Sequence, residues 1–525
     1  MQALMGEQPL TVATIFDRMR TVYGDNLVID ALPSGTTRTT YAELADRVLR
    51  LVTVLQDLGV QPGDRVASFA NNTSRHVELY FAVPLAGAVL HMVNIRLHDD
   101  QLEHVIADAG DTVLLVDDDL IPRLASLSLP SVRTFLRLGK GDTAGLDGIL
   151  DAEALMAAAA PATSLPPLTE DMACGMCHTS GTTGMPKGVV YSHRSTYLHA
   201  MGACMVDSLR LSEAERILPV VPLFHACGWG LPYAAPFTGA ELVFVGSDTS
   251  PAHLARVIAE EQVTWAAGVP TIWNGLLPVA RDLPSLKTIG IGGSATPYAL
   301  LEAYDALGIT IVQLWGMTET SPVAATSRPR RRHAGLPDDE LRRVRAMTGT
   351  ITPGLEARIV DETGVPLPWD GETVGELQCR GPWIATDYWG GAPEKFQDGW
   401  LRTGDMASME SDGYFRIVDR SKDLVKSGGE WISSVELEGA CLAHPAVREA
   451  AVIGVRSLKW DERPVVVASL SAPLSLSELR EFLSGRVAKW WLPDELVVVD
   501  EVAKTSVGKY DKKVLRAQLA AMVLP

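Results

Sequence analysis

Short apolar segments alternate with helix-length amphipathic segments through the first half of the chain, and this alternation restricts the fold more than any other feature. Parallel strands need long crossover connections, which helices of this length supply. The pattern therefore predicts right-handed βαβ units around a largely parallel sheet. Helices are expected at residues 41–58, 74–85 and 100–109, and strands at 65–70, 88–93, 112–116, 241–245, 263–267, 288–292 and 310–313.

The pattern changes at residue 350, where expected strands (355–360, 375–380 and 413–418) follow one another without helices and indicate a small β subdomain. After a charged break at 419–424, helices expected at 435–443 and 475–488 mix with strands at 449–455 and 464–470. We therefore predict an α/β fold. It has a large N-terminal domain of βαβ-type subdomains plus the β subdomain (residues 1–418), a hinge (419–424) and a small, mobile α+β C-terminal domain (425–525).

Bulk properties narrow the class of protein. A chain of 525 residues is too long for a single hydrophobic core, so at least two domains are expected. The net charge of −18 argues against nucleic acid as a partner. The sequence has neither a secretory leader pattern nor an apolar run of transmembrane length, which predicts a cytoplasmic protein without a transmembrane segment.

Residues 179–188 read Thr-Ser-Gly-Thr-Thr-Gly-Met-Pro-Lys-Gly. The glycines let backbone N–H groups turn towards an anion, the hydroxyls add hydrogen-bond donors, and Lys187 adds a positive charge. The segment is not a Walker A loop, because Pro186 precedes the lysine and an expected strand follows it. An ordinary turn is the alternative. We predict a phosphate-binding loop between two strands, with these ligands: Thr179, Ser180, Gly181, Thr182, Thr183, Gly184 and Lys187.

This loop resembles the phosphate loop of the adenylate-forming superfamily, which includes acyl-CoA synthetases, luciferases and the adenylation domains of peptide synthetases. Six further segments match the superfamily in order and approximate spacing, so the resemblance covers nearly the whole chain. The closest likeness is to bacterial medium- and long-chain fatty-acyl-CoA synthetases. The six segments are residues 222–230, 292–295, 315–319, 400–405, 426–432 and 504–509.

The resemblance implies how the adenylate would be held. His225 would lie beside the carboxylate and the acyl-adenylate, and Trp229, followed by Gly230, would gate an acyl tunnel. Thr318 would meet the α-phosphate. Glu319 would hold Mg²⁺, since a carboxylate beside a triphosphate needs a hard cation between them. Taken singly, the histidine and the tryptophan would be read as packed core residues. The adenine pocket would be lined by Gly292, Gly293, Ser294, Ala295, Trp315, Gly316 and Met317.

The later segments complete the implied site. Asp405 would bind the ribose hydroxyls, with Arg420 near the ribose and phosphate, and Lys422 would be the hinge residue. Lys509 would be the catalytic lysine that joins the attacking carboxylate to the α-phosphate. The channel for the pantetheine arm would be formed by Lys426, Gly428, Gly429, Glu430 and Trp431.

The resemblance implies an acid–thiol ligase. ATP, with Mg²⁺, would activate a carboxylic acid as an acyl-adenylate with release of pyrophosphate, and coenzyme A would then form the thioester. A medium- or long-chain fatty acid is the expected substrate. An aryl- or methylthiopropionate-CoA ligase, an amide-forming synthetase and a degenerate nucleotide-binding homologue remain alternatives. The expected partners are small molecules, with a homodimer possible as in related enzymes.

Overall fold

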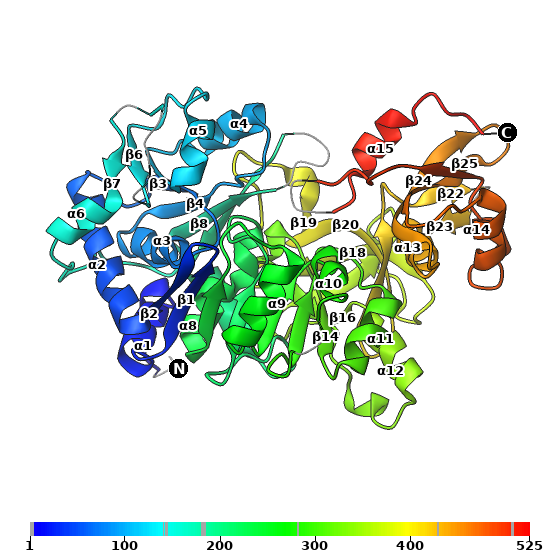
Figure 1. Cartoon of the computed structure of the whole chain (residues 1–525), viewed down its shortest axis with the longest axis horizontal. Helices are drawn as coiled ribbons and strands as arrows, with labels where there is room; N and C mark the ends of the chain where they lie inside the picture. Colours follow the sequence, from blue (N-terminus) through cyan, green and yellow to red (C-terminus); the bar gives the residue numbers. More distant parts are fainter. Residues whose placement is uncertain are drawn as a thin grey trace.

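The computed structural model describes residues 5–139, 141, 145–146, 148–179, 185–280, 283–427, 430–505 and 509–524. It has the expected α/β architecture, with a large N-terminal part and a smaller C-terminal part at one end (Figure 1). None of its helices is both long and apolar enough to cross a bilayer, within these residues.

The first sheet follows the predicted βαβ pattern. In the described part of the chain its strand order is β7-β6-β5-β3-β4-β8-β9, and every pair is parallel except β8–β9. The crossover helices α3 (Ser74–Leu85) and α4 (Asp99–Ala109) lie within a residue of the expected ranges. The strands are β3 (Arg65–Phe69), β4 (Val89–Met92), β5 (Val113–Val116), β6 (Thr134–Arg137), β7 (Leu150–Asp151), β8 (Ala173–His178) and β9 (Gly188–Ser192).

The second sheet has a parallel half in the centre of the molecule (Figure 1). Strands β11, β10, β12, β13 and β14 are parallel neighbours, and β1 joins β11 with the β1–β2 hairpin at the edge. The carboxyl ends of such strands form the usual ligand-binding edge of an open sheet. The strands are β1 (Leu27–Leu32), β2 (Gly35–Thr40), β10 (Arg216–Pro219), β11 (Glu241–Phe244), β12 (Trp265–Gly268), β13 (Thr288–Ile291) and β14 (Thr310–Gly316).

The strands expected from residue 350 onwards are present and extend this same sheet. β15 pairs antiparallel with β14, and β16, β21, β20, β18 and β17 continue beyond it. Four strands of this group, β15, β16, β19 and β20, were not foreseen, although β20 carries the segment 400–405. The strands are β15 (Val323–Thr326), β16 (Gly349–Ile351), β17 (Glu356–Val360), β18 (Val374–Arg380), β19 (Phe396–Gln397), β20 (Trp400–Met409) and β21 (Tyr414–Arg420).

The helices of the large part cover these sheets, and the longest shows how the sequence starts them. Thr40 accepts a hydrogen bond from the Glu43 backbone, and the Glu43 carboxylate bonds back to the Thr40 N–H, a capping box that begins α2. The helices besides α3 and α4 are α1 (Val12–Val22), α2 (Tyr41–Asp57), α5 (Ile121–Leu124), α6 (Ala152–Ala158), α7 (His193–Cys204), α8 (Leu231–Thr238), α9 (Pro251–Glu260), α10 (Pro270–Leu276), α11 (Tyr298–Ala306) and α12 (Asp338–Ala346).

The C-terminal residues build a separate sheet of order β23-β22-β25-β24, with β26 beside β25. The helix expected at 475–488 was too long. It ends at Leu483 because Gly485 adopts a left-handed conformation (φ +81°), which stops a helix. The elements are β22 (Val425–Ser427), β23 (Glu430–Ile432), β24 (Val447–Ser457), β25 (Asp461–Leu470), β26 (Glu495–Val498), α13 (Ser434–Leu442), α14 (Leu476–Leu483) and α15 (Lys512–Gln518).

Candidate active site

A cavity of about 670 Å³ lies at the carboxyl ends of β13 and β14, where the large part meets a loop of the C-terminal part. Segments more than 300 residues apart in sequence contribute to its wall. The site residues expected from the sequence that line it are Thr179, Lys187, His225, Trp229, Gly292, Gly293, Trp315, Gly316, Met317, Thr318, Glu319, Arg420, Lys422 and Lys509.

The expected phosphate loop does connect two strands, β8 and β9. Its ends are closed by two hydrogen bonds: Thr179 N–H donates to the Lys187 carbonyl (2.9 Å), and Lys187 N–H donates to the Thr179 hydroxyl (3.1 Å). The Lys187 ammonium lies 5.2 Å from the centre of the Tyr388 ring and 3.4 Å from the Glu394 carboxylate. The other predicted ligands, Ser180, Gly181, Thr182, Thr183 and Gly184, lie outside the described residues.

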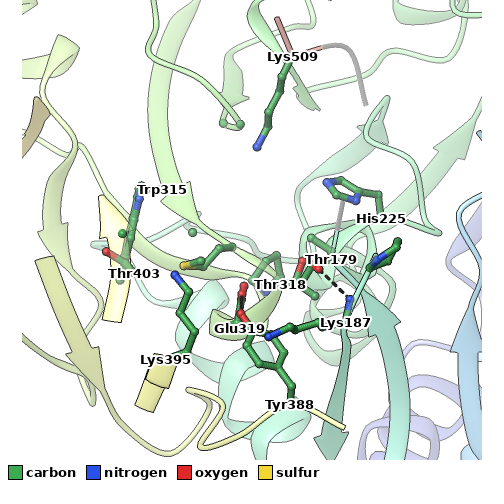
Figure 2. A pocket seen from close by; sticks show the side chains of 18 of the residues that line it. Thr179, Lys187, His225, Trp315, Thr318, Glu319, Tyr388, Lys395, Thr403 and Lys509 are labelled. Carbon is green, nitrogen blue, oxygen red and sulfur yellow. Dashed lines mark hydrogen bonds between the residues drawn. The ribbon is translucent and has the colours of Figure 1, made fainter. Parts of the chain in front are cut away.

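Thr318 and Glu319 occupy a short turn directly after β14, and both are buried. The Tyr191 hydroxyl donates to the Thr318 carbonyl (2.8 Å), and the Tyr388 hydroxyl donates to a carboxylate oxygen of Glu319. Burial and the neighbouring carboxylate raise the pKa of Tyr388, so its phenol stays a donor. These contacts fix the carboxylate at the floor of the cavity, beside Lys187 (Figure 2).

The donor set at Glu319 fits Mg²⁺. This ion takes one or two protein carboxylates and completes its octahedron with phosphate oxygens and water. Here a single buried carboxylate lies beside a threonine hydroxyl, and the described residues contain no group of three or more His, Cys, Asp or Glu side chains suited to a metal. A site of this composition would hold the ion mainly through a bound nucleotide.

Asp405, on β20, lies behind the cavity wall and does not itself line it, although its neighbours Gly404, Trp315 and Arg420 do. One of its carboxylate oxygens accepts a hydrogen bond from the Trp315 indole (2.9 Å), and the other lies 3.2 Å from the Arg420 guanidinium on the paired strand β21. The carboxylate is buried, and Asp405 raises the pKa of Arg420. Each oxygen keeps a lone pair, so the group is oriented and still able to accept bonds from hydroxyls.

Lys509 projects into the cavity from the side opposite Glu319, Tyr388 and Lys187 (Figure 2). Its Cε atom lies 3.2 Å from the place a Cβ would occupy on Gly293, whose φ of +87° also requires glycine. Burial, together with the nearby Arg420 charge, lowers the pKa of Lys509 to about 8. The small part of the molecule therefore supplies one cation to a site that the large part otherwise builds.

The apolar wall of the cavity follows a left-handed turn. Ala226, Cys227, Gly228, Trp229 and Gly230 all have positive φ, between 39° and 73°. Non-glycine residues in this conformation cost roughly 1–2 kcal/mol each, and such strain gathers at functional sites. The turn places the Trp229 ring 3.0 Å from where a Cβ of Gly292 would lie. Gly230 is buried behind the turn and does not line the cavity.

His225 directly precedes this turn and lines the cavity, to the right of Lys509 in Figure 2. Burial, with smaller contributions from the positive charges of Lys509 and Arg96, lowers the pKa of His225 to about 3. The imidazole is therefore neutral at physiological pH. It can orient a substrate carboxylate by a hydrogen bond but adds no charge.

Some expected site residues lie elsewhere. Ser294 and Ala295 are exposed and do not line the cavity. Lys426 and Trp431 face each other across the β22–β23 hairpin, with the ammonium 5.6 Å from the ring centre, and also lie away from it. Gly428, Gly429 and the side chain of Glu430 are outside the described residues.

The cavity also contains residues that the sequence did not single out. Tyr388 and Lys395 come from the long connection between β18 and β20, where no pattern marks them. Asp108, at the end of α4, is a third. His178, which is buried and does not itself line the cavity, bonds to Asp108 at 3.0 Å and could have been found because it directly precedes Thr179.

Comparison with known proteins identifies the family. The model of the AMP-binding enzyme family matches residues 16–389, and that of the AMP-binding enzyme C-terminal domain matches 436–509. A medium-chain-fatty-acid–CoA ligase of Ectopseudomonas oleovorans is 39% identical (99% of this chain, 98% of the relative). A 3-methylmercaptopropionyl-CoA ligase of Ruegeria lacuscaerulensis is 41% identical (98% of each). The crystal structure of the anthranilate CoA ligase AuaEII with anthranoyl-AMP has a TM-score of 0.88 and 25% identity (98% of this chain, 99% of that one).

Proposed function

The chain belongs to the AMP-binding enzyme family, and from this premise we propose that it joins a medium- or long-chain fatty acid to coenzyme A through an acyl-adenylate. One observation carries the proposal: Lys509, Lys187 and Glu319, from distant segments, line one cavity that also has an apolar wall. Two of these groups neutralise phosphates, the third holds their counter-ion, and the apolar wall receives the acid.

The first half-reaction brings two anions together, so its barrier is mainly electrostatic. Lys187 holds the β- and γ-phosphates, and Thr318 contacts the α-phosphate. Bound at Glu319, Mg²⁺ supplies further neutralising charge. Lys509 spans the attacking carboxylate and the α-phosphate, and His225 orients the acid. The carboxylate oxygen attacks phosphorus in line, and pyrophosphate leaves.

The nucleoside end is held by Asp405, whose carboxylate takes the two ribose hydroxyls while Trp315 and Arg420 fix its orientation. Adenine lies along Gly292, Gly293 and the segment 315–317. The contact of Ser294 and Ala295 with adenine stays a prediction, because both are exposed and neither lines the cavity.

The second half-reaction needs a thiol where Lys509 now stands. We assign residues 1–418 and 425–525 to two domains, with rotation about Lys422 removing Lys509 and bringing Lys426 and Trp431 to the cavity. Gly428, Gly429 and Glu430 belong to the same pantetheine channel. The thiol of coenzyme A then attacks the acyl carbonyl and AMP leaves. A homodimer and a cytoplasmic location stay predictions.

A methylthiopropionate-type acid is the second candidate, because a relative named for that substrate is 41% identical. The apolar lining supports an aliphatic acid in either case: it includes Val221, Trp229, Leu314 and Val323. Measuring pyrophosphate and thioester across short, long, thioether and aromatic acids, with and without coenzyme A, decides between them. Thioester formation that peaks on medium or long aliphatic acids supports the proposal. Pyrophosphate without thioester would contradict it.

The substitution Lys509→Ala tests the adenylation step. We expect the rate of pyrophosphate release to fall by at least about 100-fold, the scale of one transition-state hydrogen-bond donor. Lys513→Ala removes an exposed lysine just after the same loop and should leave the rate unchanged. Equal rates for the two variants would remove Lys509 from the mechanism.

A further inference from the structure

Two carboxylates and two histidines form one chain of hydrogen bonds that runs from the interior to the cavity. Asp111 bonds to Nδ1 of His91 (2.7 Å), Nε2 of His91 to Nδ1 of His178 (2.9 Å), and Nε2 of His178 to Asp108 (3.0 Å). Asp111 and His91 are fully buried, whereas Asp108 lines the cavity. Asp108 lies on α4, and Asp111 directly follows the residue that caps this helix. His91 lies on β4 and His178 on β8.

The three hydrogen bonds determine how many protons these four side chains share. Each of these bonds needs one proton, but two neutral imidazoles carry only two. With two protons, a ring nitrogen lone pair would face a carboxylate or the other ring nitrogen. A third proton satisfies every bond, whether it rests on an imidazole or on a carboxyl. The four groups then carry a net charge of −1 and one proton that can shift along the chain.

The surroundings favour the buried end for this proton. Burial raises the pKa of Asp111, although His91 and Arg65 oppose the rise. At the cavity end, the hydrogen bond from His178 lowers the pKa of Asp108, with smaller effects from His104 and His91. Burial lowers the pKa of His178 to about 4. The other ionisable groups nearby are the buried thiol of Cys177 on β8 and Lys187, which lines the same cavity.

The chain also meets the phosphate loop. His178 is the last residue of β8, and Thr179 and Lys187 close the loop directly after it. The indole of Trp389 donates to the Asp108 carbonyl (2.9 Å), while the Trp389 N–H donates to the Gly188 carbonyl (2.8 Å). Asp108 is thus tied to both strands that carry the loop, at the end of the cavity where the β- and γ-phosphates are placed above.

We propose that the Asp111–His91–His178–Asp108 chain delivers a proton to the leaving pyrophosphate. As the acid oxygen bonds to the α-phosphorus, the bond from that phosphorus to the bridging oxygen breaks and its electron pair stays on pyrophosphate. The proton of each hydrogen bond crosses to its neighbour, Asp108 passes one to a pyrophosphate oxygen, and Asp111 is left ionised. Water at the cavity end restores the proton. This inference rests on the proposed function.

The test uses two substitutions in the full chain. Asp108→Asn keeps an oxygen that accepts from His178 but holds no proton, and His91→Gln interrupts the chain in its middle. In both, we expect single-turnover acyl-adenylate formation to be about 100-fold slower, the low end of general acid catalysis. The solvent deuterium isotope effect on this step should disappear, whereas the high-pH decline that Lys509 causes should remain. Thioester formation from supplied acyl-adenylate should be unchanged.

Asp248→Asn is the matched control, since Asp248 lies 4.0 Å from His253 and neither residue lines the cavity. It should retain the wild-type rate and pH profile. Asp108 is partly exposed, so Asp108→Asn should fold even if the buried His91→Gln does not. An unchanged isotope effect in Asp108→Asn would overturn the relay, as would a loss confined to ATP affinity. Wild-type protein that releases no pyrophosphate with any acid would instead overturn the proposed function.

Discussion

At the scale of single residues, the site is a set of charges whose positions are fixed by neutral partners. Tyr388 fixes Glu319, and Trp315 fixes one oxygen of Asp405. Such partners cost no reorganisation when charge develops, which is how enzymes stabilise transition states electrostatically. The effect of each partner can be measured separately.

The lowered pKa of Lys509 predicts a pH dependence. In the proposed mechanism its ammonium is the form that stabilises the transition state, and with a pKa of about 8 it is lost as pH rises through that value. We expect kcat/KM for ATP, which reports the free enzyme, to fall tenfold per pH unit above about 8. In Lys509→Arg the guanidinium stays charged, so whatever activity remains should not fall there. The same decline in both proteins would exclude this lysine as its source.

Tyr388→Phe removes the hydrogen bond to the Glu319 carboxylate. A bond to a charged group contributes about 1.5–3 kcal/mol, so kcat/KM should drop roughly 10- to 150-fold, and the Mg²⁺ concentration for half-maximal rate should rise. Tyr304→Phe is the control, because that buried hydroxyl donates to the Trp273 carbonyl (2.8 Å) away from the cavity. It should lower Tm and leave the Mg²⁺ dependence unchanged. A Mg²⁺ dependence unaffected by Tyr388→Phe would contradict the assigned role of Glu319.

Charged site residues in distinctive motifs were predictable from the sequence, whereas their neutral partners were not. Lys187, Glu319 and Lys509 lie in motifs whose combination of residues is seldom found outside such binding sites. Tyr388 is one aromatic residue in a long irregular connection, and its partner lies 69 residues away. Only the folded chain brings such pairs together.

At the scale of elements, the left-handed turn at 226–230 is the most specialised. Gly230→Ala would place a Cβ at 2.4 Å from the His199 ring, and the imidazole accepts a bond from Val323 N–H (3.1 Å) that fixes it there. We expect a loss of roughly 2–4 kcal/mol in the free energy of unfolding. Gly308→Ala is the control. Gly308 has nearly the same φ as Gly230 (+72° against +73°), but no atom lies within 4 Å of the Cβ that alanine would add there.

The difference between these two variants isolates packing from backbone strain. Thermal or denaturant unfolding of both variants measures this difference. Equal losses in the free energy of unfolding would mean that the His199 ring moves aside at no cost. No periodicity marks this turn in the sequence, because Ala-Cys-Gly-Trp-Gly fits many loops. By contrast, α3 and α4 were predicted within a residue, since their apolar spacing and flanking turns agree.

At the scale of the whole molecule, the junction near Lys422 joins two bodies that share the cavity. The Arg516 guanidinium donates to the Lys422 carbonyl (3.1 Å) and to Asp423 (2.7 Å), while Ser421 N–H donates to the Gly404 carbonyl (3.0 Å). Residues 421–423 therefore make hydrogen bonds both to the large part of the molecule and to the C-terminal part. The charged residues at 419–424 predicted a break in the chain here. Their hydrogen-bond partners, Arg516 and Gly404, could be identified only from the folded structure.

Lys422→Pro should separate the two half-reactions. Proline fixes φ near −65° and so resists a rotation centred on this residue. With Lys509 already in the cavity, we expect pyrophosphate release within about twofold of wild type, a change below about 0.5 kcal/mol. Thioester formation from supplied acyl-adenylate should fall by at least tenfold. Equal losses in the two assays would place the rotation elsewhere or exclude it.

In the proposed mechanism, Lys509, which packs on Gly293, gives the catalytic cycle a direction. The depressed pKa of Lys509 means that its charge is poorly solvated there until a triphosphate supplies the missing anions. Departure of pyrophosphate removes most of that negative charge, and the docked lysine again becomes unfavourable. Loss of pyrophosphate, the product of the first half-reaction, thus weakens the docking of Lys509 that the same half-reaction required. We expect the order of events to be enforced by charge alone, without a separate signal.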